Sequence, residues 1–333
     1  MTTRTPNLST TFATPSATEP LAKFTDPDVT ATGEPRARVA LRQLETLWFN
    51  TGTLCNITCR NCYIESSPTN DALVYLTAAE VSRFLNEAKQ LGTREIGFTG
   101  GEPFMNPEIL AMLGEALAMG FDVLVLTNAM TPMQRPRIKE GLMDLHRRFG
   151  SRLCLRVSLD HYTQAHHEEE RGLNTWQPAI LGLDWLCASG FRTAIAGRTC
   201  WHETADMARQ GYAQLFKERG WPIDADDAGQ LMLFPEMAES DTVPEITTRC
   251  WSILGKSPDE MMCASSRMVV KRNGAVAPVV LPCTLLPYDT AFEMGTTLAD
   301  AGKADGGMFD SGAVKLCHRH CAEFCVLGGG SCS

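Results

Sequence analysis

No apolar run in this 333-residue sequence approaches the length of a membrane span, because its longest apolar stretches are only strand-sized. The N-terminus lacks a charged segment followed by an apolar one, so a secretory signal is not expected. Basic residues are not in excess, since 30 Lys and Arg stand against 39 Asp and Glu. These absences predict a cytoplasmic protein that has neither a membrane nor a nucleic acid as its partner.

Cysteine, by contrast, is plentiful, with 13 residues, and without a secretory signal we interpret the thiols as cytosolic. Three of them form a C-x3-C-x2-C pattern, Cys55, Cys59 and Cys62. No fourth ligand lies nearby, since the next cysteine is Cys154 and the first histidine is His146. Zinc prefers four protein ligands at a structural site, whereas three thiolates suit a 4Fe–4S cluster whose fourth iron stays open for a substrate or cofactor.

A second motif, Gly-Gly-Glu-Pro at 100–103, follows the strand-like run 95–98. Two glycines let a backbone approach a ligand closely, and a neighbouring carboxylate can pair with an ammonium group. An ordinary loop is the alternative for this motif taken alone. The two motifs in this order resemble the radical S-adenosylmethionine (radical SAM) superfamily. The resemblance implies that the three cysteines bind a 4Fe–4S cluster and that the turn holds the amino group of S-adenosylmethionine.

Strand-like and helix-like segments alternate through the middle of the chain. This alternation predicts parallel strands with right-handed crossovers, in an α/β barrel or a doubly wound sheet. The resemblance selects the first, as a partial, TIM-like (β/α)6 barrel. The expected strands are 45–51, 95–98, 122–127, 153–159, 192–197 and 231–234, and the expected helices are 77–91, 107–119, 135–149, 175–189 and 204–219.

Three regions are expected along the chain. Residues 1–43 are rich in Thr, Pro, Ala and Ser and predict a flexible N-terminal tail. Residues 44–240 would form the barrel, and residues 241–333 would form a small cysteine-rich extension.

Polar residues follow the expected strands, where such barrels place their chemistry. A Ser-Leu-Asp motif at 158–160, followed by His-x3-Arg-Gly at 167–172, resembles radical SAM maturases and molybdenum-cofactor-type enzymes. By that resemblance Ser158 would contact the cofactor, Asp160 would face the substrate, and Arg171 would pair with a carboxylate. A surface ion pair with the neighbouring glutamates is the alternative for Arg171. The residues expected to bind the cofactor are Tyr63, Gly100, Gly101, Glu102, Pro103, Asn128, Ser158, Arg171 and Arg198.

For Tyr63 and Asn128 the sequence leaves the cofactor contact open. The family often has an aromatic residue before the third cysteine, and this chain has Asn61. Tyr63, directly after that cysteine, could pack on the adenine instead. For Asn128, a cap on the following turn is the alternative to a cofactor contact.

From residue 241 onward seven of the 13 cysteines follow. The stretch 268–276 predicts a β-hairpin with an Asn-Gly turn. A hairpin with closely spaced cysteines after it resembles the auxiliary-cluster extension of radical SAM enzymes called SPASM or, in short form, twitch. The C-x3-C-x3-C-x6-C spacing departs from the usual C-x2-C-x5-C-x3-C, so we expect one auxiliary 4Fe–4S cluster. Its expected ligands are Cys263, Cys283, Cys321 and Cys325, with Cys317 and Cys332 in reserve.

Two alternatives remain for this cysteine-rich region. A structural zinc site is one, because His318 and His320 lie between two of the cysteines and zinc often takes mixed Cys and His ligands. Simple buried thiols are the other. Cys154, Cys187 and Cys200 lie on or beside apolar runs and are expected to fill the core.

The resemblance implies an enzyme that cleaves S-adenosylmethionine reductively. The resulting 5′-deoxyadenosyl radical would abstract a hydrogen atom from a substrate, expected to be a peptide or protein. A reducing partner such as flavodoxin or ferredoxin is implied as well. One alternative is an enzyme of small-metabolite or cofactor biosynthesis. Another is a non-catalytic iron–sulfur or zinc scaffold, which would leave the Gly-Gly-Glu-Pro motif unexplained.

Overall fold

The computed structural model describes residues 22–235 and 242–328. Its centre is an eight-stranded sheet with the order β7-β6-β5-β4-β3-β2-β8-β9. All neighbouring strands are parallel except the last pair, β8 and β9. The strands are β2 (Thr46–Asn50), β3 (Glu95–Thr99), β4 (Asp122–Thr127), β5 (Leu153–Ser158), β6 (Arg192–Thr199), β7 (Leu231–Pro235), β8 (Ser266–Val270) and β9 (Val279–Leu281).

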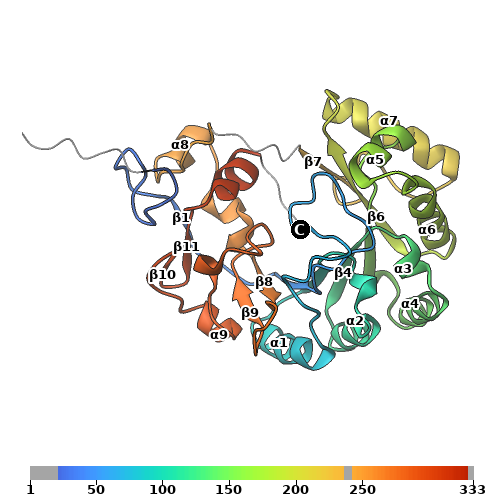
Figure 1. The fold of residues 1–333 in the computed structure, drawn as a ribbon, viewed down its shortest axis with the longest axis horizontal. Helices are drawn as coiled ribbons and strands as arrows, with labels where there is room; N and C mark the ends of the chain where they lie inside the picture. Colours follow the sequence, from blue (N-terminus) through green and yellow to red (C-terminus); the bar gives the residue numbers. More distant parts are fainter. Residues whose placement is uncertain (1–21, 236–241, 329–333) are drawn as a thin grey trace, which may run out of the picture.

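Helices lie along the outside of the curved row of strands (Figure 1). Five were expected, and they are α1 (Ala78–Gln90), α2 (Ile109–Ala118), α4 (Pro136–Phe149), α6 (Trp176–Ala188) and α7 (Ala205–Arg219). The first begins with a capping box between Thr77 and Glu80. Two short helices at the strand ends were not expected, α3 (Thr131–Gln134) and α5 (Gln164–Arg171).

The two faces of the sheet bury different side chains. Leu47 and Phe49 of β2 belong to the large core shared with the outer helices. Trp48, between them, packs with Cys154 and Met268 in a smaller apolar cluster. This alternation follows from the two-residue period of a strand, and it assigns the smaller cluster to the inner face of the curved sheet.

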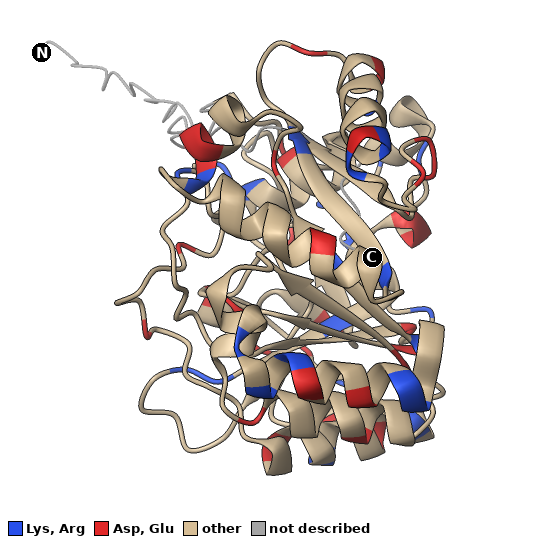
Figure 2. Ribbon diagram, turned by 90° about the vertical axis from the view of Figure 1, so that its right-hand side faces the viewer, with Lys and Arg blue, Asp and Glu red and all other residues tan. Residues whose placement is uncertain are grey.

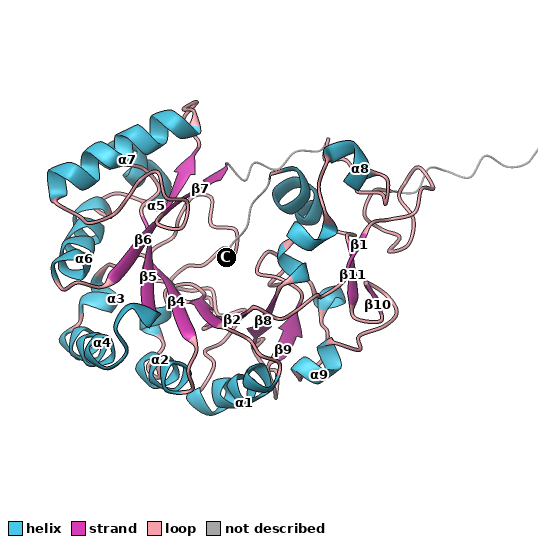
Figure 3. Cartoon of the chain, turned by 180° about the vertical axis from the view of Figure 1, so that it is seen from behind, coloured by secondary structure: helices cyan, strands magenta, loops and turns pink. Residues whose placement is uncertain are grey.

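The sheet is open, since β7 and β9 are its edges in the described part of the chain. All six expected strands are present. After β7, the next described helix is only the short α8 (Cys250–Leu254). The sheet instead gains β8 and β9 on its other side, next to β2 (Figure 3). These two strands form the predicted hairpin, but the second strand starts later than expected, after Pro278, whose backbone lacks an N–H group.

The expectation of a flexible tail is wrong for residues 22–43, which pack against the C-terminal region. In this segment β1 (Arg38–Val39) pairs with β11 (Ala313–Lys315), which also pairs with β10 (Phe309–Asp310). The remaining described helix is α9 (Leu298–Ala301). Residues 1–21 lie outside the described part. The composition of the segment is typical of a tail, but its packing partners lie more than 200 residues away in the sequence.

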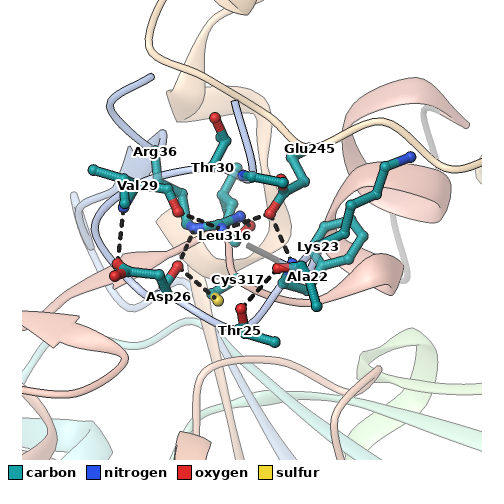
Figure 4. Close-up of polar contacts among 12 residues, drawn as sticks. Ala22, Lys23, Thr25, Asp26, Val29, Thr30, Arg36, Glu245, Leu316 and Cys317 are labelled. Carbon is teal, nitrogen blue, oxygen red and sulfur yellow. Dashed lines mark hydrogen bonds and ion pairs between the residues drawn. The ribbon is translucent and has the colours of Figure 1, made fainter. Parts of the chain in front are cut away.

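A buried arginine holds this N-terminal segment in place (Figure 4). Arg36 is only 1% exposed, and its Nη2 lies 2.6 Å from Oε1 of Glu245. Its guanidinium also donates to the backbone carbonyls of Asp26, Val29 and Leu316. A buried charge is tolerated when it is paired and fully hydrogen-bonded, as this one is.

Lys, Arg, Asp and Glu residues are interspersed on the helices that cover the sheet (Figure 2). Within the described residues, no helix combines the length and the apolar character that crossing a membrane would require.

We predict that Arg36→Ala lowers the free energy of unfolding by about 3–5 kcal/mol, because it leaves the carboxylate of Glu245 buried without its partner. Chemical denaturation would measure this change. Arg38→Ala is the matched control, since Arg38 lies two residues away and its ion pairs with Asp28 and Asp310 are partly exposed. The control should lose at most about 1 kcal/mol. Equal losses in the two variants would contradict the anchoring role of Arg36.

Candidate active site

Two loops that carry the sequence motifs pack backbone to backbone. The N–H of Gly101 donates to the carbonyl of Gly52 at 2.8 Å, and the N–H of Glu102 donates to the carbonyl of Leu54 at 3.1 Å. A Cβ atom on Gly101 would lie 2.1 Å from the Leu54 oxygen, and one on Gly100 would lie 2.5 Å from the Gly52 oxygen. Gly100 also has a φ of +142°. The glycines are therefore required for contact with the loop that leads into the first cysteine.

A cavity of about 200 Å³ lies at the carboxyl ends of the strands. All the residues expected to hold the first cluster and the cofactor line it, except Glu102 and Pro103, and Asp160 lines it as well. The C-terminal region closes one side with Thr284, Leu285 and Phe324. The fold thus brings together residues from the ends of six strands and from the extension.

The three cysteines of the first motif face this cavity as thiols. Burial raises the pKa of Cys55 to about 12, and burial also raises that of Cys59. The guanidinium of Arg171 opposes the shift at Cys59, since its Nη1 lies 3.9 Å from the Cys59 sulfur. Binding of a metal cluster would convert these thiols to thiolates and release their protons.

Glu102 lies behind the cavity wall. Its carboxylate accepts hydrogen bonds from the hydroxyl of Thr127 (2.9 Å) and from the N–H groups of Asn128 (2.9 Å) and Phe104 (3.2 Å). Burial nevertheless raises the pKa of Glu102 to about 7, because all three donors are neutral. A cation placed nearby would favour the ionised carboxylate.

Of the two roles that the sequence left open for Asn128, the structure shows the cap on the following turn, and the cofactor contact stays a prediction. Its side chain lines the cavity, and its Oδ1 accepts the N–H of Met130 (3.0 Å), which caps the following turn. Its Nδ2 donates to Oδ1 of Asn56 in the cysteine loop at 2.9 Å. Asn128 therefore connects the end of β4 to that loop.

A buried charge network crosses the mouth of the barrel. Arg171 faces Asp160 with two nitrogens, Nε at 2.8 Å and Nη2 at 3.1 Å from the two carboxylate oxygens. Nε of Arg198 lies 3.6 Å from the same carboxylate. Burial alone would raise the pKa of Asp160, but the two arginines hold it below its usual value. The alternative of a surface ion pair for Arg171 is thus wrong, because its partner is the buried Asp160.

The same network holds the cysteine loop between its second and third thiols. The carboxylate of Glu170 accepts the backbone N–H and the side-chain Nδ2 of Asn61, both at 2.9 Å. The backbone carbonyl of Glu170 accepts the N–H of Arg60 at 2.7 Å, and Arg198 donates to the carbonyl of Asn61 at 3.0 Å. Asn61, in the position where the family often has an aromatic residue, is therefore a hydrogen-bonding residue here.

A second group of thiols lies in the C-terminal region. Cys263, Cys283, Cys321 and Cys325 line one small apolar cavity of about 20 Å³. The last two are four residues apart on a π-helical segment, Cys321–Leu327. Burial raises the pKa of Cys263 to about 12, and burial also raises the pKa of Cys321 well above its ordinary value. The four thiols chosen from the sequence are thus neighbours in space.

The other residues of this region that were expected as ligands, as far as the structure describes them, do not line the second cavity. The thiol of Cys317 donates to the carbonyl of Asp26 at 3.3 Å, in the N-terminal segment. His318 and His320 are not among the residues that line the second cavity, and Nδ1 of His320 lies 3.1 Å from the Leu285 carbonyl. Cys332 lies outside the described residues.

Neither thiol group is arranged for a single ion. Among the described residues, no three His, Cys, Asp or Glu side chains converge as one metal ion would require. None of the described cysteines is in a disulfide either. A 4Fe–4S cluster is wider than one ion and spreads its thiolate ligands over its corners, so thiols lining a cavity are the donor set that fits it.

Several residues of the site gave no usable signal in the sequence. Glu170 is the last of three consecutive glutamates, and only the fold determines which of them is buried. Trp48 and Arg156 line the cavity from within strands, where the sequence favours a purely structural role. Leu285 lines both cavities, so the two cavities are neighbours.

Comparison with known proteins agrees with this geometry. Residues 49–207 match the model of the Radical SAM superfamily. Molybdenum cofactor biosynthesis protein 1 of Drosophila melanogaster is 27% identical over 150 residues, which are 42% of this chain and 24% of that protein. The serine-type anaerobic sulfatase-maturating enzyme of Klebsiella aerogenes is 27% identical over 178 residues, 50% of this chain and 42% of the enzyme. The chain thus matches less than half the length of these relatives.

A solved structure extends the likeness in fold. The crystal structure of Streptococcus suis SuiB bound to S-adenosylmethionine aligns with a TM-score of 0.54 and 14% identity. The alignment covers 76% of this chain and 63% of SuiB. At this identity the likeness concerns the fold alone.

We predict that Gly101→Ala prevents the first motif from retaining iron, because the new methyl group would displace the backbone of Leu54 and with it the cysteine loop. Iron and sulfide would be counted after anaerobic reconstitution, with circular dichroism to check folding. Gly114→Ala in α2 is the control, because its Cβ would meet its nearest neighbour at an ordinary 3.5 Å. An iron content in Gly101→Ala equal to that of the control would refute the packing argument.

We also predict that Glu170→Ala weakens iron retention, since it removes both side-chain hydrogen bonds to Asn61. The adjacent Glu169→Ala is the control, because Glu169 is about half exposed and pairs with Arg60 at the surface. Iron loss against time in the presence of a chelator would be compared for the two variants. We expect iron to be lost at least several-fold faster from Glu170→Ala than from Glu169→Ala. The same rate of iron loss in both variants would show that the hydrogen bonds from Glu170 to Asn61 do not hold the cysteine loop.

Proposed function

This chain is a member of the radical SAM superfamily, and from that premise we propose that it cleaves S-adenosylmethionine to start a radical reaction on a bound substrate. The observation that carries the proposal is the placement of Cys55, Cys59 and Cys62 on the wall of one cavity beside the Gly-Gly turn. Three thiols without a fourth fit a 4Fe–4S cluster with one open iron. When bound, the cluster supplies the electron that splits the cofactor into methionine and the 5′-deoxyadenosyl radical.

The residues of the chain bind and orient the cofactor. Glu102 is buried beside the turn with only neutral donors, so an ammonium group near it would gain a charge-assisted interaction. Tyr63 offers an aromatic surface to the adenine, and Ser158 and Asn128 offer polar contacts from the ends of β5 and β4. The apolar remainder of the cavity excludes water, which protects a radical from other hydrogen donors.

Asp160 is placed to aim the substrate. It lines the cavity, and Arg171 and Arg198 hold it ionised and fixed in position. Since both arginines already have a carboxylate partner in Asp160, a cofactor carboxylate could share them but would not be their only partner.

We propose further that Cys263, Cys283, Cys321 and Cys325 hold an auxiliary 4Fe–4S cluster, as in a SPASM or twitch extension. Cysteine is the one type of metal-ligating side chain, other than the thioether of Met261, that lines the second cavity, and this supports iron–sulfur ligation over a mixed Cys and His zinc site. The shared lining residue Leu285 makes the two cavities neighbours, and this supports exchange of an electron between the substrate and this cluster. A flavodoxin or ferredoxin would be the source of electrons.

The substrate that we propose is a peptide or protein. The sulfatase-maturating relative supports this class, and the molybdenum-cofactor relative supports the second candidate, a small molecule of cofactor biosynthesis. A cell extract that stimulates 5′-deoxyadenosine formation would separate the two. Protease digestion of the extract should abolish the stimulation for a peptide or protein substrate, whereas undiminished stimulation after digestion would favour the small molecule.

We predict that replacing Cys55, Cys59 and Cys62 together by Ala abolishes 5′-deoxyadenosine formation by the anaerobic, dithionite-reduced protein. The wild type should hold about eight irons and the triple variant about four, as two 4Fe–4S clusters and one require. Undiminished 5′-deoxyadenosine formation in the triple variant would refute the assignment. A wild type that holds clusters but cleaves no S-adenosylmethionine would favour the scaffold alternative.

A further inference from the structure

A second buried arginine lies beside the thiols of the C-terminal region. Arg267 of β8 is 1% exposed. Its Nη1 donates to the backbone carbonyls of Cys263 and Ser266, both at 2.7 Å. Its Nε and Nη2 are also buried, and neither has a hydrogen-bond partner among the described residues. Buried donors of a charged group are costly to leave unpaired, so their position suggests a partner that the polypeptide does not supply.

Strand β8 turns Arg267 to the face of the sheet that packs in the same core as Cys263 and Cys283, although Arg267 is not among the residues that line the second cavity. Met268 and Val270 belong to the apolar cluster on the inner face of the sheet. Val269 belongs to the large core that also contains Cys263 and Cys283. Because side chains alternate along a strand, Arg267 points to the same side as Val269.

The charges around Arg267 agree with this orientation. Burial lowers the pKa of its guanidinium, and the acidic groups that oppose this shift are the thiols of Cys263 and Cys283. The contrast with Arg36 is informative, since that buried arginine has a carboxylate 2.6 Å away. For Arg267 the acidic groups that act on its pKa are the thiols of two proposed cluster ligands.

We propose that Arg267 is the counter-charge of the auxiliary cluster and that its Nε and Nη2 donate to thiolate or sulfide sulfur of that cluster. The inference rests on the auxiliary cluster proposed above. A 4Fe–4S core with four thiolates is anionic and becomes more so when it gains an electron. A fixed positive charge and hydrogen bonds to sulfur therefore stabilise the reduced form more, which raises the reduction potential.

The test uses the variant without Cys55, Cys59 and Cys62, so that the auxiliary cluster is observed alone. In this background Arg267→Met and Arg267→Gln remove the charge, and Arg267→Lys keeps it. Arg272→Met is the matched control, because Arg272 lies in the same hairpin and pairs with Glu293. The reduction potential would be measured by redox titration followed by electron paramagnetic resonance. We expect both neutral variants to shift to more negative potential than the control, and Arg267→Lys to shift less.

Each outcome of this experiment bears on the inference. A loaded neutral variant with the potential of the control overturns it. If the neutral variants are folded but lose their iron while Arg267→Lys retains it, the need for the charge is supported. If Arg267→Lys loses its iron as well, Arg267 acts through packing and the inference fails. If the variant without Cys55, Cys59 and Cys62 holds no iron, both the auxiliary cluster and the proposed role of Arg267 are refuted. That result would not contradict the proposal that the wild type binds a cluster at Cys55, Cys59 and Cys62 and cleaves S-adenosylmethionine.

Discussion

The contact between the Gly-Gly turn and the cysteine loop is so close that a single methyl group on Gly101 would lie 2.1 Å from the carbonyl oxygen of Leu54. The parallel register of β2 and β3, with Asn50 opposite Thr99, makes the two strands end side by side. Two loops that leave neighbouring strands at one level can then share backbone hydrogen bonds. The position of the first cysteine, and hence of the thiol-lined wall, depends on that contact.

The buried charges at the barrel mouth extend this constraint to the rest of the loop. Taking Asp160, Glu170 and two arginines out of water is unfavourable unless each charge meets a partner. Here the partners include the backbone between Cys59 and Cys62, so satisfying the charges also fixes the loop. The short helix α5 contributes to the proposed site by carrying Glu170 and Arg171 to this position.

The cysteine-rich C-terminal region is joined to the central sheet through the hairpin of β8 and β9. Strand β8 adds to the edge of β2, so the hairpin belongs to the central sheet and is not a separate unit beside it. Its inner face closes the small apolar cluster, and its other face carries Arg267 and packs in the core that contains Cys263 and Cys283. The N-terminal segment then covers this region through Arg36, whose charge is paired with Glu245.

Local patterns in the sequence were enough for the six strands, the five long helices and the three motifs, because period, caps and glycine requirements act within a few residues. The four C-terminal thiols were chosen by resemblance to the auxiliary-cluster extension, and they line one cavity. Tertiary structure alone decided that Glu170 rather than Glu169 holds the loop, and that Arg171 pairs with Asp160. It alone decided that residues 22–43 pack against the C-terminal region, where a tail was expected, and that the thiol of Cys317 donates to the carbonyl of Asp26. These outcomes depend on burial and on partners far apart in the sequence, and no local pattern records either.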